Sequence, residues 1–153
     1  MYLMNNNKGE NMTNQEVLKM LKNKITEHGL AEQGWTWSLN NRKRCLGLCC
    51  HGRKEIIISK VFSRIRPSDE TLDTVLHEIA HALVGAGHGH DAIWKGMCRK
   101  IGANPERLAN PSVRPDYKYK CYCPKCGKLE TGFHRRPTRT FICPKCESIL
   151  KIR

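Results

Sequence analysis

Two histidines separated by three residues give the strongest chemical signal in this sequence of 153 residues. They belong to His77-Glu78-Ile79-Ala80-His81, an H-E-x-x-H motif. Residues four apart on an α-helix lie one turn apart and about 40° from each other around the axis, so both imidazoles can reach one metal ion. The motif therefore predicts a zinc-binding helix. The alternative is a pair of histidines on a helix flank with ordinary partners.

The two histidines need a third protein ligand, because a catalytic zinc site has three protein ligands and one position open for water. His88, His90 and Asp91 follow the predicted helix closely and are the candidates. The Gly85-Ala86-Gly87 segment ends the helix and lets the chain turn back toward the metal. We expect one of the three side chains to complete the ligand set.

Glu78 lies beside a ligand, but it is about 100° around the helix from His77 and so is poorly placed to be a ligand itself. Zinc lowers the pKa of its bound water toward about 7 and polarises a carbonyl group. A nearby carboxylate can accept the proton of that water and pass it to a leaving amine. The motif thus predicts metal-assisted hydrolysis with Glu78 as general base. His88 is a candidate for stabilising the oxyanion, and the alternative is that it is simply solvated.

Two C-x-x-C pairs near the C-terminus predict a second metal site with a structural role. Cys123-Pro124-Lys125-Cys126 and Cys143-Pro144-Lys145-Cys146 are separated by 16 residues. Two thiolates on one tight turn bind one side of a tetrahedral ion, and two such turns complete a zinc ribbon. We expect hairpin strands between the pairs, at residues 131–134 and 138–141. The alternatives are redox dithiols or an iron–sulfur cluster.

The other cysteines are expected to pack in the interior. Half-buried thiols on or after a predicted strand are more plausible than a third metal site for Cys45, Cys49 and Cys50, with His51 beside them. Cys98 falls on a predicted helix, and Cys121 adds a thiol that could compete with Cys123 for the ribbon metal. An odd total of nine cysteines favours a reducing compartment over a disulfide framework.

Positive charge is concentrated in the C-terminal third. The chain has a formal net charge of +13, of which residues 111–153 contribute +8. Such a module favours a polyanionic partner, most often nucleic acid, and the alternative is that the charge serves solubility. Phe133 and Phe141 could stack on bases or could fill the small core of the ribbon. The candidate nucleic-acid-binding residues are Arg135, Arg136, Arg139, Lys125, Lys128 and Lys145.

The hydrophobic pattern predicts an α+β fold that carries these residues. A helix begins near residues 13–16 and ends at Gly29. Three short strands follow in a small antiparallel or mixed sheet, the last of them central: Trp35–Leu39, Cys45–Cys49 and Glu55–Ser59. The metal-binding helix has Ser68 or Asp69 as its expected cap, and a third helix spans Asp91–Ile101.

Composition divides the chain into four segments. Residues 1–12 are polar and rich in asparagine, and we expect a disordered tail there. Residues 13–110 form the predicted α+β domain. Residues 111–116 are the predicted linker, and residues 117–153 are the cysteine- and lysine-rich ribbon.

The motif and its surroundings resemble the SprT-like, or Spartan-type, metalloprotease family. The resemblance rests on Leu76–Ala82 and Gly87–Trp94. It covers roughly residues 14–150 through further matches at Trp35-x-Trp37, Leu46-Gly47, Ile58-Ser59 and the C-x-x-C ribbon. In that family the third zinc ligand is a histidine four residues before an aromatic residue, which implies His90 here. Glycine often follows that histidine, whereas this chain has Asp91, so His88 stays the alternative.

The resemblance implies a zincin-like α+β domain followed by a zinc ribbon, with one catalytic and one structural Zn²⁺. It also implies an endopeptidase that cleaves proteins bound or crosslinked to DNA. The implied site residues are His77, His81 and His90 for the catalytic zinc, Glu78 as base, and Cys123, Cys126, Cys143 and Cys146 for the structural zinc. The competing hypotheses are a nucleic-acid-binding protein whose zincin core is only a scaffold, and a metallohydrolase that acts on other substrates.

No apolar stretch reaches the roughly 20 residues that a membrane-spanning helix needs, which argues against a transmembrane protein. The first seven residues lack the apolar segment of a secretory signal. We therefore expect a cytoplasmic monomer with protein substrates and DNA as partners. It would be associated with the nucleoid or, for a phage protein, located in the host cytoplasm.

Overall fold

The structure is a computed structural model that describes residues 11–106 and 114–153. The chain divides into two compact units, with the boundary between Arg114 and Pro115. The predicted tail, residues 1–12, lies outside the described residues except for Asn11 and Met12. The predicted linker, residues 111–116, is described from Arg114 onward.

Helix α1 (Asn14–Glu27) begins at a capping box. The Thr13 hydroxyl accepts a hydrogen bond from the Glu16 backbone N–H at 3.3 Å, and the Glu16 carboxylate accepts one from the Thr13 N–H at 2.7 Å. These two bonds satisfy donors that a helix start otherwise leaves unpaired. One face of α1, spaced at four-residue intervals, is buried: Val17, Leu21 and Ile25.

Three strands form the mixed sheet of the first unit, which confirms the predicted α+β class. They are β1 (Thr36–Asn40), β2 (Gly47–Cys50) and β3 (Glu55–Ser59), in the order β1-β3-β2. β3 is central, pairing in parallel with β1 and antiparallel with β2. β2 is therefore an edge strand of this sheet.

Three more helices follow the sheet. They are α2 (Lys60–Ser63), α3 (Ser68–Val84) and α4 (Ala92–Ile101). The four-residue α2 was not predicted, because so short a helix has no hydrophobic period to detect. The predicted cap of α3 at Ser68 or Asp69 is wrong. Pro67 is the N-cap residue, and its carbonyl accepts the Thr71 N–H at 3.1 Å as the first hydrogen bond of the helix.

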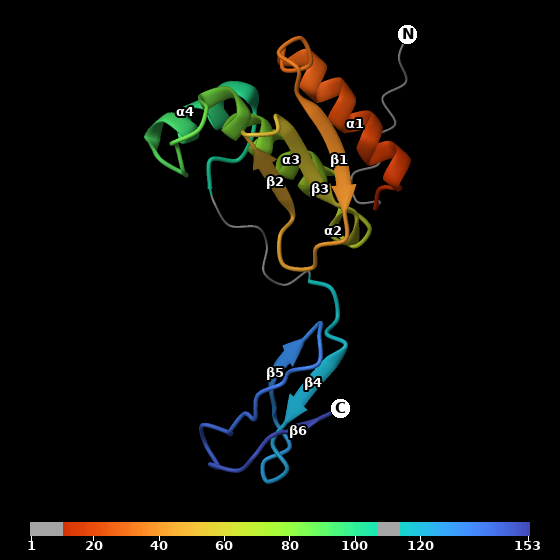
Figure 1. The fold of residues 1–153 in the computed structure, drawn as a ribbon, viewed down its shortest axis with the longest axis vertical. Helices are drawn as coiled ribbons and strands as arrows, with labels where there is room; N and C mark the ends of the chain where they lie inside the picture. The colour runs from red at the N-terminus through yellow and green to blue at the C-terminus, as the bar shows by residue number, and fades with distance from the viewer. Residues whose placement is uncertain (1–10, 107–113) are drawn as a thin grey trace. The chain divides into compact units, whose positions relative to one another are not determined.

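The core of the first unit lies between the sheet and helices α1 and α3, and Figure 1 shows α3 running behind the strands. Apolar side chains of both helices meet the central strand in a cluster that includes Val17, Leu21, Ile25, Ile56, Ile58, Val75 and Ile79. A second cluster joins α3 to α4: Leu76, Ala80, Trp94, Cys98 and Ala103. Because α3 packs against the sheet and α1 on one side and against α4 on another, the direction of its remaining side is fixed.

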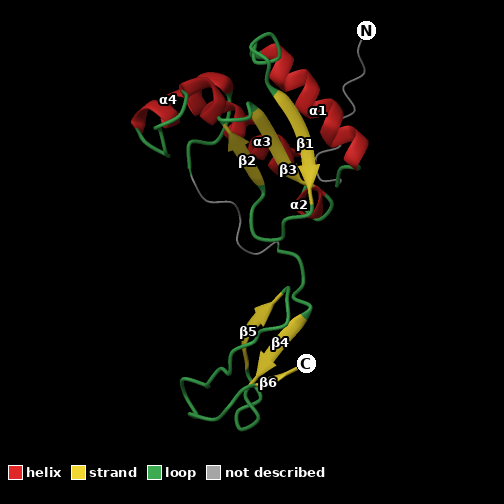
Figure 2. Cartoon of the chain, in the orientation of Figure 1, coloured by secondary structure: helices red, strands yellow, loops and turns green. Residues whose placement is uncertain are grey.

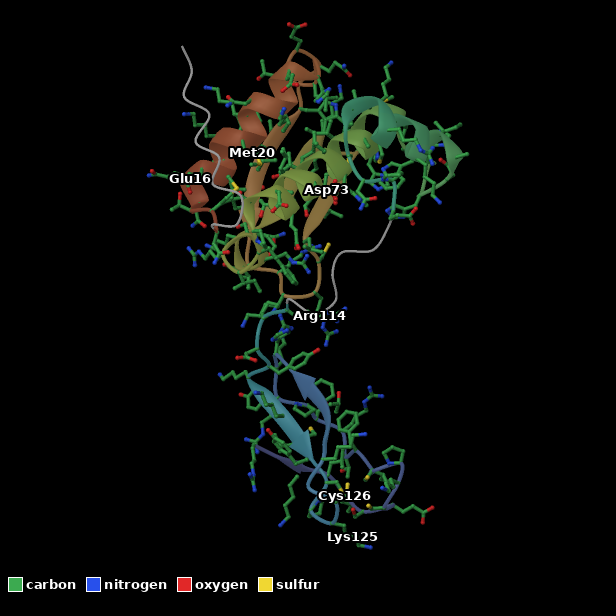
Figure 3. The ribbon with its side chains drawn as sticks, turned by 180° about the vertical axis from the view of Figure 1, so that it is seen from behind. Glu16, Met20, Asp73, Arg114, Lys125 and Cys126 are labelled. Carbon is green, nitrogen blue, oxygen red and sulfur yellow. The ribbon has the colours of Figure 1, made fainter. Side chains whose placement is uncertain are left out.

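The second unit is built from strands and loops, without helix in residues 115–153 (Figure 2). Its strands are β4 (Tyr119–Tyr122), β5 (Leu129–Phe133) and β6 (Lys151–Ile152), in the antiparallel order β5-β4-β6. The loop between β4 and β5 carries the first C-x-x-C pair, with Lys125 and Cys126 labelled in Figure 3.

The hairpin predicted between the two cysteine pairs is only partly correct. β5 covers most of residues 131–134, but residues 138–141 are not a strand. The strands instead flank each pair, with β4 and β5 around the first and a single bridge, Ile142 to Ile149, around the second. Each pair must form a tight turn to bind one ion, so pairing begins on the two sides of that turn.

Replacing Thr13 with alanine should destabilise the first unit by about 1 kcal/mol, because it removes the hydroxyl of the capping box. Urea unfolding, followed by circular dichroism, measures this change. Thr13→Ser is the matched control, since serine keeps the hydroxyl, and it should stay near the wild-type stability. Equal stability of the alanine variant and the wild type would contradict a stabilising role for the cap.

Candidate metal centres

Three half-buried imidazoles converge on one side of α3. His77 and His81 come from α3, and His90 comes from the loop before α4. The His90 Nε2 atom lies 3.0 Å from the Nε2 of His77 and 3.4 Å from the Nε2 of His81. The ligand atoms of all three residues lie within 4.8 Å of one another. The residues that the sequence assigned to the catalytic zinc are thus brought together.

The loop from α3 to α4 is built to return to the metal-binding helix. Gly85 ends α3 with a φ of 86°, a conformation that favours glycine. Asp91 then caps α4, accepting the Trp94 backbone N–H at 2.9 Å. With both ends of the loop anchored, His90 is held opposite His77 and His81.

His88, the alternative third ligand, is outside this cluster. Its Nδ1 lies 2.7 Å from a carboxylate oxygen of Asp91, and its backbone interacts with the ring of His81. Asp91 therefore has two structural roles at once, capping α4 and pairing with His88. These contacts fix the loop that carries His90, in the manner of the outer partners that orient metal ligands.

The three imidazoles fit a zinc ion. Nitrogen ligands at about 2.0–2.1 Å from a tetrahedral zinc lie about 3.3 Å from each other, close to the spacing found here. Burial, followed by the neighbouring imidazoles, lowers the pKa of His77 to about 4, and burial lowers that of His81 to about 4. Both rings are therefore neutral at pH 7, which is the form that binds metal.

Glu78 is the buried carboxylate of this site, with 8% of its surface exposed. Burial raises its pKa to about 7, and the backbone N–H of Cys49 opposes that rise. The side chain lies against the backbone of Gly47 in β2, where a Cβ atom would stand 2.8 Å from Glu78 Cγ. Glycine at this position lets the edge strand approach the helix closely enough to enclose the carboxylate.

An open cavity of about 600 Å³ contains the imidazoles and Glu78. One wall is β2 and the segment before it, and the other is α3. Sequence reasoning missed several residues that line this cavity: Arg44, Asp73, Thr74 and Glu106. Asp73 was detectable, because it precedes His77 by four residues and so shares its helix face.

The four cysteines of the two C-x-x-C pairs also form one cluster, with all four sulfur atoms within 4.8 Å of one another. Both turns have the same construction. The N–H of Gly127 bonds to the Cys123 carbonyl at 2.8 Å, and that of Glu147 bonds to the Cys143 carbonyl at 2.9 Å. Both residues have a positive φ, 69° and 51°, although only one is glycine. Four sulfurs in this arrangement suit a tetrahedral zinc ion.

The remaining thiols lie where packing was expected. Cys45, Cys49 and Cys50 are half-buried, and Cys98 is buried in the α3–α4 cluster. Cys121 is buried on β4 and packs in the ribbon core, outside the cluster of four sulfurs. In the cluster itself, a hydrogen bond from the Cys126 backbone lowers the pKa of Cys123 to about 6.

The cationic side chains of the second unit lie at its surface. All six candidates for nucleic-acid binding are exposed: Arg135, Arg136, Arg139, Lys125, Lys128 and Lys145. Arg139 lies over the ring of Phe141 at 5.9 Å. Phe141 and Phe133 pack against each other and against the buried cysteines, as the core interpretation of these rings predicted.

The fold and the site together define an α+β protein with an H-E-x-x-H helix and two candidate metal centres, one of three histidines and one of four cysteines. The profile of the SprT-like family matches residues 14–114, more than half of the chain. The chain belongs to the SprT-like family. A relative described as "Protein SprT-like", from Oceanobacillus iheyensis, is 28% identical over 87 residues. That match covers 54% of this chain and 58% of the relative. None of the helices in residues 11–106 and 114–153 is long and apolar enough to cross a membrane.

Replacing Gly47 with alanine should displace the Glu78 side chain, because the new Cβ would stand 2.8 Å from its Cγ. A crystal structure of the variant measures the displacement. Gly52→Ala is the control, since its Cβ would meet nothing within 4 Å. An unmoved Glu78 carboxylate in Gly47→Ala would contradict the close approach.

Replacing Cys126 with serine should lower the zinc content by one ion per chain and unfold residues 115–153. A unit of about 40 residues rarely folds without such a metal. Elemental analysis gives the metal content, and amide hydrogen exchange locates the unfolding. Cys50→Ser, at a half-buried thiol outside the cluster, should retain both properties. Full zinc content in Cys126→Ser would exclude the four-sulfur site.

Proposed function

We propose that this protein is a zinc-dependent endopeptidase that cleaves proteins bound or crosslinked to DNA. The observation that carries the proposal is the position of Glu78. It is a buried carboxylate between two converging imidazoles, in the same open cavity. A purely structural metal site has no need of a buried acid beside its ligands, whereas hydrolysis needs a proton acceptor there.

His77, His81 and His90 hold the catalytic zinc in this proposal. A zinc ion so bound activates a water molecule and polarises a peptide carbonyl. Glu78 accepts a proton from the attacking water at a carboxylate oxygen and delivers it to the leaving nitrogen. The backbone of β2 holds that carboxylate in place, through the N–H of Cys49 and the close approach of Gly47.

A polypeptide substrate suits the shape of the cavity. Its wall is β2, an edge strand whose outer side pairs with no strand of the described sheet. An extended peptide can add to such an edge through backbone hydrogen bonds, without dependence on its sequence. This favours an endopeptidase over a hydrolase for small molecules, because residues of the edge strand line the cavity.

The second unit supplies the connection to DNA in the proposal. Its four-cysteine cluster holds the structural zinc, and its exposed cations are available to phosphates. In the described residues, none of the six candidate lysines and arginines forms a salt bridge. The same cations favour the second candidate function, a nucleic-acid-binding protein without activity, in which the first unit is a scaffold.

Replacing Glu78 with glutamine should abolish proteolysis and leave two zinc ions per chain, because glutamine keeps the size of the side chain and cannot accept the proton. The measurement is cleavage of casein and of a protein crosslinked to DNA. Reactions without DNA, with single-stranded DNA and with duplex DNA separate the possible activators. The experiment uses the full chain, and Glu32→Gln, at an exposed residue far from the site in sequence, is the control.

Wild-type cleavage by the glutamine variant would exclude Glu78 as the base. A wild-type protein that binds two zinc ions and DNA but cleaves neither substrate would favour the scaffold function. Cleavage that is the same with and without DNA would support a protease and contradict the proposed link to DNA.

A further inference from the structure

One indole contacts all three imidazoles of the helix-borne site. The ring centroid of Trp94 lies 4.6 Å from that of His77, 5.2 Å from that of His81 and 4.5 Å from that of His90. His77 and His90 meet the indole edge to face, and His81 stacks on it with an interplanar angle of 24°. The three imidazoles therefore all contact one aromatic surface, the indole of Trp94.

The indole is held in place independently of the imidazoles. Trp94 is fully buried, and it packs with Leu76 and Ala80 of α3 and Cys98 of α4. Asp91 fixes the first turn of α4 by accepting the Trp94 backbone N–H. The indole is thus anchored by the packing of two helices, so its position does not require a bound ion.

The contact with the indole limits the conformational freedom of the imidazoles in the metal-free site. When no ion joins the three nitrogens, each imidazole could adopt other side-chain rotamers. Contact with a fixed aromatic surface removes part of that freedom before the ion binds. The conformational entropy of the three imidazoles is then lost during folding and not during zinc binding, which raises the affinity for zinc.

The indole N–H has no part in this role. Among the described residues, the Nε1 atom of Trp94 is buried without a hydrogen-bond partner. A buried donor without a partner is unfavourable, so the residue is not explained by hydrogen bonding. What Trp94 contributes to the site is the area and shape of its ring.

We propose that Trp94 is the positioning residue of the three-histidine site. Its indole holds His77, His81 and His90 in convergent rotamers without the metal, and thereby sets the zinc affinity and the coordination geometry. The proposal depends on metal binding at this site and not on the proposed proteolysis. A chain that binds zinc normally but cleaves nothing would contradict the proposed function alone.

The test compares Trp94→Leu, which removes the aromatic ring, with Trp94→Phe, which keeps an aromatic ring and lacks the N–H. Zinc dissociation constants come from competition with a chromogenic chelator. The visible spectrum of bound Co²⁺ reports coordination geometry, and bands from thiolate ligands identify the ribbon site. Ile101→Ala is the matched control, since it removes packing from the same buried cluster at the C-terminal end of α4.

We expect Trp94→Leu to weaken zinc binding at the histidine site by about tenfold or more, the usual range for outer residues of metal sites, and to change its Co²⁺ spectrum. Trp94→Phe should retain most of the affinity, and Ile101→Ala should match the wild type. Wild-type affinity and spectrum in Trp94→Leu would overturn the proposal. Equal losses in the leucine and phenylalanine variants would also overturn it.

A second measurement decides the matter if Trp94→Leu does not fold. In the metal-free wild-type protein, NMR should detect nuclear Overhauser contacts between the indole and the rings of His77, His81 and His90. Their presence without metal supports positioning by the indole. Their appearance only after zinc is added would show that the ion orders the rings, which contradicts the proposal.

Discussion

The convergence of three imidazole nitrogens on one point is the constraint on which the rest of the first unit depends. Two of them follow from helix geometry, because His77 and His81 lie one turn apart on α3. The third requires the chain to leave the helix and return within a few residues. Gly85 permits the departure, and the cap at Asp91 fixes the return. The core clusters on the two sides of α3 keep the convergence point in a fixed direction.

The edge strand β2 completes this site, since it places its backbone against Glu78, the proposed general base. Glu78 is buried because β2 approaches α3 closely at Gly47. The close approach of β2 has two effects. It buries the Glu78 carboxylate, which raises its pKa, and it places a strand edge beside the cavity. In the second unit, four sulfurs on two similar turns are added to an apolar core that is small in so short a segment.

Much of this was predictable from local patterns. Helix α1, the central position of β3, the α+β class and the pairing of two C-x-x-C turns follow from residue types and spacing. The residues that line the cavity from outside the motif, such as Arg44 and Glu106, were not predictable. They are brought together by tertiary packing, which leaves no periodic trace in the sequence. The strand predicted at residues 138–141 is wrong for a related reason. The cysteine turns, and not the alternation of side chains, determine where strand pairing begins.

The central claim is that His77, His81 and His90 bind one zinc ion. A crystal structure of the zinc-loaded protein, with anomalous diffraction recorded on both sides of the zinc absorption edge, tests it most directly. The account predicts one anomalous peak within bonding distance of the three Nε2 atoms, in addition to the peak among the cysteines. An anomalous map with the cysteine peak alone, or with the first peak on His88 in place of His90, would contradict it.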